Sequence, residues 1–366
     1  MESITKIISQ FDIAGTVKEY EEVKTGNVND TFIVTLDSEV IGPTKFVLQR
    51  INTFVFTSPE AVVDNMLVLA SHFRKSKTNS ANNRWEIPEI IRCKNENSVL
   101  EEPPGEFWRM ITYIENSMTY QKIESGFQAE ETGYSLGCFH TLTTDIDTAD
   151  LKDTLPGFHI TPLYLKQYDQ VLNYGKSVNF RAEKTYCRNF IEKRRKLVRV
   201  LEDAKNKGTI SNRIIHGDPK VNNFVFERNT GKAIGIIDLD TVKPGLILFD
   251  LGDCIRSCCN PAGEETENLD NVDFKVDYAR ALIKGYYCIA GRKLRPAEKN
   301  LLILAIKLMT FELGLRFFTD FLMGDVYFKT KHKAHNLLRA MVQFKLTEKI
   351  ESKETQFQKS IEEIFK

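Results

Sequence analysis

The sequence has no net charge, because 50 lysine and arginine residues balance 50 aspartate and glutamate residues in a chain of 366. Proteins that bind nucleic acid or anionic membranes commonly have an excess of basic residues, so this balance argues against both kinds of partner. The seven cysteines form no CxxC pair and no even disulfide set, which argues against a zinc site or a disulfide-stapled secreted domain. We therefore expect a cytoplasmic protein.

Long uninterrupted apolar segments are also missing. The first fifteen residues, MESITKIISQFDIAG, lack the apolar stretch of a signal peptide. Residues 301–323 are apolar enough to suggest a membrane span, but charges are costly at the centre of a bilayer. Four charged residues interrupt this segment: Lys307, Glu312, Arg316 and Asp320. We expect a core helix here. The chain also has no internal repeat and no low-complexity segment.

Residues with strand propensity dominate the first hundred positions. TFIVTL at 31–36 and KFVLQRI at 45–51 predict an antiparallel pair, and WEIPEII and EFWRMITYI predict further strands. A helix is expected in SPEAVVDNMLVLASHFRK, where Ser58 can cap and Pro59 suits the first turn. From about residue 116 the pattern becomes mostly helical. We predict an α+β protein with an N-terminal unit, residues 1–115, and a larger helical unit, residues 116–366.

The segment IIHGDPKVNNFVF, residues 214–226, places polar residues between two apolar runs. The apolar runs predict strands, so the polar stretch is a loop held at both ends, where catalytic groups tend to lie. Asp218 and Asn223 have the HxDxxxxN spacing of a kinase catalytic loop. A second apolar strand ends in Asp238 and Asp240, and carboxylates in such a position suit Mg²⁺.

HGDPKVNN, IDLDT and FDLGD, in this order, resemble the aminoglycoside phosphotransferase and choline kinase superfamily of small-molecule kinases. Within it, HGDPKVNNFVF…IIDLDTVKPGLILFDLGDCIR looks most like the N-acetylhexosamine 1-kinases, as do GNVNDTFIV, FVLQRIN and LRFFTDFLMGDVYF. The resemblance spans nearly the whole chain. It implies a protein-kinase-like fold of two lobes, with a small antiparallel sheet in the N-terminal lobe and a larger, mainly helical C-terminal lobe.

The resemblance also implies ATP and Mg²⁺ and assigns roles to the motif residues. Asp218 would be the catalytic base that contacts the acceptor. Asn223 and Asp238 would hold the metal, and Asp240 is a further metal candidate. Two other motif residues would support the loop and the helix after it: His216 and Asp250. Each residue taken singly could instead be a turn residue, but their order and context favour chemistry.

The N-terminal unit offers weaker nucleotide-binding signals. The turn TGNVND, residues 25–30, has one glycine instead of GxGxxG, so Asn27 or Asn29 could replace backbone contacts to phosphate. Asn29 and Asp30 are also candidates for acceptor binding. Arg50 is the candidate cation for the phosphates, with Gln49 in its place if the strand register slips by one. Glu60 or Asp64 could orient Arg50, which could alternatively be a surface residue.

The resemblance places the segment between the lobes at residues 112–115. Backbone groups there would read adenine, and three residues would contact the nucleotide: Thr112, Tyr113 and Ile114.

The helix KLMTFELGLRFFTDFLMGDVYF suggests an acceptor pocket. Glu312, Arg316 and Asp320 lie four residues apart on one face of an otherwise apolar helix. Such a stripe is either a salt-bridged solvated face or the polar wall of a pocket, and the apolar surroundings favour burial. We expect Arg316 to contact the acceptor, with Tyr327 as a second contact or an ordinary core residue.

With these features, the resemblance implies a Mg-ATP-dependent kinase that phosphorylates a small-molecule sugar, an N-acetylated hexosamine at its anomeric hydroxyl. We expect a monomer or dimer with no nucleic-acid or membrane partner. One alternative is a kinase of the same fold for choline, an amino alcohol or an aminoglycoside, although a pocket dominated by Arg316 argues against cationic acceptors. The other alternative is a catalytically silent nucleotide-binding module.

Overall fold

The computed structural model of the protein describes residues 2–23, 28–37, 42–77, 84–174 and 182–366. The α-helices are α1 (Glu2–Ile8), α2 (Pro59–Lys77), α3 (Gly126–Leu142), α4 (Thr161–Tyr174), α5 (Ala182–Arg194), α6 (Val200–Asn206), α7 (Ile247–Cys258), α8 (Val276–Ala290), α9 (Pro296–Met323), α10 (His335–Ser352) and α11 (Glu354–Phe365). The strands are β1 (Thr16–Glu22), β2 (Asp30–Asp37), β3 (Thr44–Ile51), β4 (Ile90–Ile91), β5 (Leu100–Glu102), β6 (Glu106–Thr112), β7 (Ser117–Met118), β8 (Arg213–Ile215), β9 (Phe224–Glu227), β10 (Ala233–Ile236) and β11 (Lys243–Gly245).

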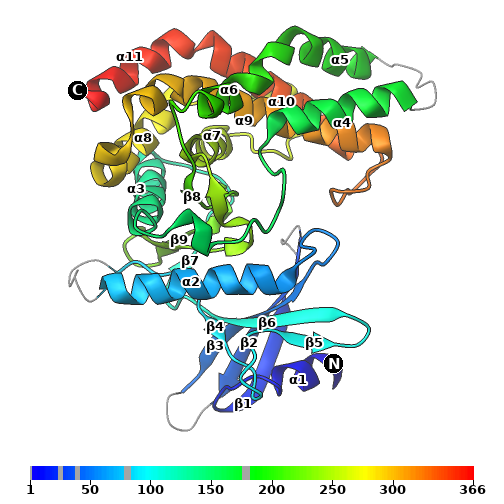
Figure 1. The fold of residues 1–366 in the computed structure, drawn as a ribbon, viewed down its shortest axis with the longest axis vertical. Coiled ribbons are helices and arrows are strands. Elements are labelled where there is room, and N and C mark those ends of the chain that lie inside the picture. Colours follow the sequence, from blue (N-terminus) through cyan, green and yellow to red (C-terminus); the bar gives the residue numbers. More distant parts are fainter. Residues whose placement is uncertain (1, 24–27, 38–41, 78–83, 175–181) are drawn as a thin grey trace.

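The N-terminal part is an antiparallel sheet in the order β1-β2-β3-β6-β4, with β5 paired to β6. Helix α2 crosses this sheet on the side of the helical part, and α1 lies near the far end of the sheet (Figure 1). The remaining helices gather in the second part of the molecule. This arrangement confirms the predicted α+β, two-lobed fold class.

The two faces of the sheet have different environments, because side chains alternate along a strand. Val47 and Ile111 face α2 and pack into the main core with Met66. Leu48 and Met110, the next residues along the same strands, pack into a separate cluster that contains α1 residues. The face of each strand residue therefore decides whether its side chain points toward the helical lobe or away from it.

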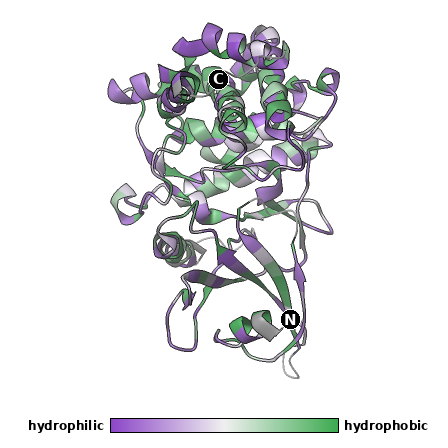
Figure 2. Ribbon diagram, turned by 90° about the vertical axis from the view of Figure 1, so that its right-hand side faces the viewer, coloured by the Kyte–Doolittle hydropathy of each residue, from purple (hydrophilic) through white to green (hydrophobic). Residues whose placement is uncertain are grey.

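Helix α9 is the core helix predicted for residues 301–323. It is 28 residues long and buries most of its side chains against α7 and α10, and the helices in the interior of this lobe are predominantly hydrophobic (Figure 2). Across the described ranges, none of the helices has the length and apolar character needed to span a bilayer.

Two loops of the helical lobe run side by side because their flanking strands pair. Strand β8 pairs antiparallel with β11, and β9 pairs antiparallel with β10. The loop at 216–223 leads from β8 to β9, and the loop at 237–242 leads from β10 to β11. Both loops thus connect one strand pair to the other, which brings the two motif segments together.

Candidate active site

The loop at 216–223 is held by Asp250, a fully buried residue of α7. Its carboxylate oxygens accept hydrogen bonds from the backbone N–H groups of His216 (2.7 Å) and Gly217 (2.8 Å). Gly217 has a φ of 87°, and a Cβ atom there would lie 2.6 Å from the carbonyl oxygen of Thr241. Only glycine fits this position without displacing the second loop.

His216 connects the two loops. Its Nε2 lies 3.0 Å from the carbonyl oxygen of Ile237, so Nε2 carries the hydrogen and donates it. The hydroxyl of Thr241 donates to the carbonyl of His216 at 2.8 Å. His216 therefore has a supporting position, as its place in the motif implied.

Asp218 is partly exposed at the end of this scaffold and forms an ion pair with Lys220 at 2.5 Å. Burial by itself would raise the pKa of Asp218, but the charge and hydrogen bond of Lys220 outweigh it and lower that pKa. The amide nitrogen of Asn223 donates to the backbone carbonyl of Asp218 at 2.8 Å. Asp218 is thus an ionised carboxylate at neutral pH, and the amide oxygen of Asn223 is left for another partner.

Asp240 and Asp238 have opposite environments. Asp240 is buried, with one oxygen 2.5 Å from the guanidinium of Arg109 and the other 2.7 Å from the side-chain amide of Asn29. Both of its oxygens are therefore occupied by residues of the N-terminal lobe. This geometry makes Asp240 a link between the lobes rather than a free ligand.

Asp238 reaches solvent and adopts a left-handed backbone with a φ of 65°. The side chain is exposed, but partial desolvation by neighbouring residues raises the pKa of Asp238 to about 6. The charge of Lys220 opposes the rise, and the charges of Asp240 and Asp218 add to it. The carboxylate of Asp238 makes no capping hydrogen bond to the short turn that follows it, so it is available to a ligand.

The donor set suits Mg²⁺. This ion commonly takes one or two protein oxygens and completes its octahedron with substrate phosphates and water. Asp238 supplies a carboxylate, and Asn223 supplies an amide oxygen because its nitrogen is already committed to Asp218. Among the described residues no group of three His, Cys, Asp or Glu side chains forms a metal site.

Arg50 lies away from these carboxylates. It pairs across the sheet with Asp30 and Trp108 in the register of β2, β3 and β6, and forms ion pairs with Asp30 (2.5 Å) and Glu106 (2.6 Å). Its neighbour Gln49 is on the α2 face, where its amide oxygen accepts from Arg109. The structure thus gives no support to Arg50 or Asp30 as ligand-binding residues.

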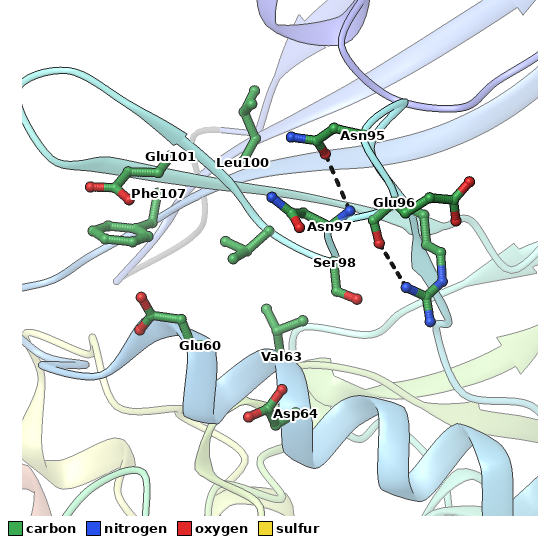
Figure 3. A pocket seen from close by; sticks show the side chains of 12 residues that line it. Glu60, Val63, Asp64, Asn95, Glu96, Asn97, Ser98, Leu100, Glu101 and Phe107 are labelled. Carbon is green, nitrogen blue, oxygen red and sulfur yellow. Dashed lines mark hydrogen bonds between the residues drawn. The ribbon is translucent and has the colours of Figure 1, made fainter.

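Glu60 and Asp64 do not contact Arg50 either. Both line a cavity of about 450 Å³ between α2 and the turn before β5, together with Asn97 and Phe107 (Figure 3). Asp64 also forms an ion pair with Lys152 at 2.6 Å. This cavity lies in the N-terminal lobe and contains none of the motif residues.

The other ligand-binding residues predicted in the N-terminal lobe lie in different environments. Asn27 lies outside the described residues. Asn29 is buried and holds Asp240, so its side chain is engaged in structure. Thr112 accepts a hydrogen bond from the backbone of Glu89 at 3.0 Å. The hydrogen bond of Thr112 neither supports nor contradicts the nucleotide-binding role predicted for the segment at 112–115.

Tyr113 and Ile114 belong to that same segment. Lys45 lies over the Tyr113 ring at 5.6 Å. Ile114 is buried and packs with Val225 and Ile234 of the hairpin β9–β10. Ile114 therefore anchors the segment at 112–115 to the β9–β10 hairpin of the helical lobe.

Arg316 of α9 is enclosed by aromatic rings. Its guanidinium carbon lies over four of them, at 5.0 Å from Phe158, 5.0 Å from Tyr164, 5.7 Å from Tyr327 and 5.3 Å from Phe328. Burial would lower the pKa of Arg316, but the nearby Tyr164, Tyr327 and Glu312, and to a smaller extent Asp218, raise it overall. Arg316 is therefore a cation held among these four rings.

The salt-bridged stripe considered for α9 does not form. Glu312 accepts hydrogen bonds from His159 and Thr161, and Asp320 accepts from the backbone of Tyr327 and the side chain of Asn336. Each carboxylate is thus satisfied by another partner. Within the described ranges Arg316 has ring contacts but no ion pair, which leaves its donors free for a ligand.

Three residues of this region were not identified from the sequence: Lys220, Arg109 and His159. Lys220 had a readable signal, a cation two residues after the candidate base. Arg109 and His159 had none, because each reaches the site from a strand or segment that is distant in sequence.

A family model described as "Phosphotransferase enzyme family" matches residues 19–286. Among solved structures, a microcompartment-associated aminopropanol kinase is similar with a TM-score of 0.65 and 13% identity, covering 98% of each chain. A choline kinase from Cryptosporidium parvum has a TM-score of 0.54 and 16% identity, covering 99% of this chain and 96% of its own.

A spectinomycin phosphotransferase, solved with ADP and spectinomycin, has a TM-score of 0.57 and 12% identity, covering 96% of this chain and 98% of its own. At these identities the structural likenesses show a shared fold. The family match covers more than half of the chain and includes both motif loops. The chain therefore belongs to the phosphotransferase enzyme family and has the fold of its small-molecule kinases.

Proposed function

We propose that the protein transfers the γ-phosphate of ATP to the anomeric hydroxyl of an N-acetylated hexosamine. Asp218 would accept the hydroxyl proton as the oxygen approaches phosphorus, because it is an ionised, accessible carboxylate on a rigid loop. The ADP-bound spectinomycin phosphotransferase supports an adenine nucleotide as donor.

Asn223 and Asp238 would hold Mg²⁺, which offsets charge on the phosphate oxygens when bound. Lys220 is a better candidate than Arg50 for a phosphate contact. It forms an ion pair with Asp218, and the negative charge of Asp238 helps to raise the pKa of Lys220. A cation beside the candidate base could offset charge on the transferring phosphate. Asp240 would keep Asp238 in place from the N-terminal side.

The proposal of a sugar acceptor rests on the aromatic rings around Arg316. An ammonium acceptor such as choline requires aromatic faces and carboxylates, but here the faces are covered by the protein's own guanidinium. A second cation would be repelled. Free guanidinium donors instead suit the hydroxyl and acetamido oxygens of a neutral sugar.

An acceptor screen tests this function. Purified protein with Mg-ATP would be offered N-acetylglucosamine, N-acetylgalactosamine, glucose, choline, ethanolamine and kanamycin, with ADP release and phosphorus NMR of the product as readouts. We expect turnover of the N-acetylated sugars to their 1-phosphates. Turnover of the amines alone would overturn the sugar proposal and retain the kinase, and nucleotide binding without any transfer would favour a silent module.

Arg316→Ala is expected to lower kcat/KM for the sugar by about 10- to 150-fold, with the KM for ATP little changed. This range corresponds to about 1.5–3 kcal/mol, the worth of a hydrogen bond to a charged group. Steady-state kinetics with each substrate varied in turn measures the effect.

Arg316→Met separates the hydrogen bonds from the packing, because methionine keeps an unbranched side chain among the rings and loses every donor. It should lose as much activity toward the sugar as the alanine variant while melting closer to wild type. Arg292→Met, at an exposed arginine, is the matched control. Wild-type sugar kinetics in Arg316→Met would remove Arg316 from the acceptor pocket.

A further inference from the structure

The segment at 151–161, between α3 and α4, contacts several parts of the candidate site. The backbone of Lys152 exchanges hydrogen bonds with the side chain of Asn65 on α2, both at 2.9 Å. The Thr154 hydroxyl donates to the backbone carbonyl of Asp240 at 2.7 Å. Near its end, the segment reaches the loop at 216–223 and helix α9 through one side chain, His159.

The imidazole of His159 lies between two hydrogen-bond acceptors. Nδ1 is 2.8 Å from a carboxylate oxygen of Glu312, and Nε2 is 2.7 Å from the backbone carbonyl of Gly217. A carbonyl oxygen accepts only, so Nε2 must carry a hydrogen. The other oxygen of Glu312 accepts from the Thr161 hydroxyl at 2.5 Å. An ionised carboxylate accepts only, so with Glu312 ionised Nδ1 also carries a hydrogen and the ring is an imidazolium.

The backbone and packing around His159 hold the ring in this position. His159 has a φ of 65°, a left-handed conformation that is uncommon for residues other than glycine. Its ring is 3.9 Å from that of Phe158 and 5.4 Å from that of Phe249. Phe158 in turn lies under the guanidinium of Arg316. The segment that carries His159 thus also forms part of the candidate acceptor pocket.

The bond to Gly217 acts on the peptide that precedes Asp218. The N–H of Gly217 is held by Asp250, and its carbonyl is held by His159. Both polar groups of the residue before the candidate base are therefore tied to buried, charged partners. Such charge-assisted hydrogen bonds are stronger than neutral ones, and they orient the side chain that follows.

We propose that His159 is a positioning residue for phosphoryl transfer: a buried imidazolium that ties the acceptor helix α9, through Glu312, to the carbonyl of Gly217 and so aims Asp218 at the acceptor hydroxyl. This inference rests on the proposed function, because it takes Asp218 as the base. Burial would lower the pKa of His159, but the charge and hydrogen bond of Glu312 raise it overall, in agreement with the geometry. His159 does not touch the reacting atoms.

The variant His159→Asn tests the link, because asparagine tolerates a left-handed backbone and is too short to span both acceptors. We expect kcat to fall by about 10²-fold, the cost of a small misplacement of a reacting group, with the KM for ATP unchanged. Glu312→Gln should lose less, since its amide can donate to Nδ1 of a neutral ring while Nε2 still donates to Gly217. The exposed His332 supplies the control His332→Asn, which should match wild type.

Nitrogen NMR of labelled histidine provides a readout that is independent of catalysis. In wild type at neutral pH, both nitrogens of His159 should appear protonated, and in Glu312→Gln only one. A neutral His159 ring in wild type, or a folded His159→Asn with wild-type kcat, would overturn the proposal. If the proposed function fails instead, wild type itself will release no ADP with the sugars, whereas the histidine spectrum will still show the imidazolium.

Discussion

Asp218→Asn is expected to lower kcat for the sugar by about 10²- to 10⁴-fold, the range that general base catalysis contributes. The amide cannot accept the hydroxyl proton, but it keeps the size of the carboxylate and an oxygen for the hydrogen bond from Lys220. ATP binding should survive, because Asp218 acts on the acceptor. Single-turnover transfer and nucleotide titration measure the two effects separately.

Asp145→Asn is the matched control, since Asp145 is an exposed carboxylate after α3. It should transfer phosphate like wild type. If Asp218→Asn also turned over at a near-normal rate while folded, Asp218 would not be the base. A loss of ATP binding in this variant would instead place its main effect on the nucleotide side, through Lys220.

Asp238→Asn is expected to lower kcat/KM for Mg-ATP by more than about 10²-fold. Changes to residues that only support a metal ligand cost about 10- to 100-fold, so loss of the ligand itself should cost at least as much. Asparagine tolerates the left-handed backbone of this position. A Mg²⁺ titration of activity should show a large shift in the concentration that gives half-maximal rate.

Asp240→Asn is the informative comparison, because the two carboxylates lie two residues apart. Asp240 and Arg109 are both almost fully buried, and removing one partner of such a pair costs up to about 3–5 kcal/mol. We expect a clear drop in melting temperature and a smaller loss of activity in the folded fraction. Equal losses of Mg²⁺ affinity in both variants, with unchanged melting, would mean that the two carboxylates share the metal.

The melting temperatures of Asp238→Asn and wild type should differ in a pH-dependent way when Mg²⁺ is absent. The raised pKa of Asp238, about 6 in the folded protein, means that its charged form destabilises the fold above that pH. As pH falls through about 6 the folded protein takes up this proton before the unfolded chain does, so wild type gains stability. The variant has no proton to take up at this position. It should therefore melt higher than wild type at pH 7.5, and its advantage should shrink at pH 5. An advantage that stays constant over this range would contradict the raised pKa.

Local patterns in the sequence were sufficient for the fold class and for the two motif loops. The spacing of apolar residues shows which face of a strand or helix is buried, and it does so without reference to the element that packs against that face. This was sufficient to identify β2, β3, α2 and α9. The polar loop of residues 216–223 could be recognised because apolar strands bound it on both sides. Asp218 and Asn223 are five residues apart on one rigid loop, so their proximity was already implied by their spacing.

The partners of each side chain were decided only by the tertiary structure. Arg50 and Gln49 are adjacent in sequence, but strand pleating sends them to opposite faces, and the pairing with β6 selects Arg109 as the buried partner of Asp240. A local sequence pattern does not show which of two neighbouring strand residues will face the helical lobe.

Long-range contacts also explain why Asp238 and Asp240 differ, and why the role of His159 could not be identified from the sequence. The two carboxylates have the same chemistry in the sequence, and they differ because Asp240 meets Arg109 and Asn29 while Asp238 reaches solvent. His159 contacts Gly217 and Glu312, which are far from it along the chain. Sequence by itself determined the two loops and the candidate residues on each of them, whereas long-range packing decided which charges are neutralised and which remain free to bind.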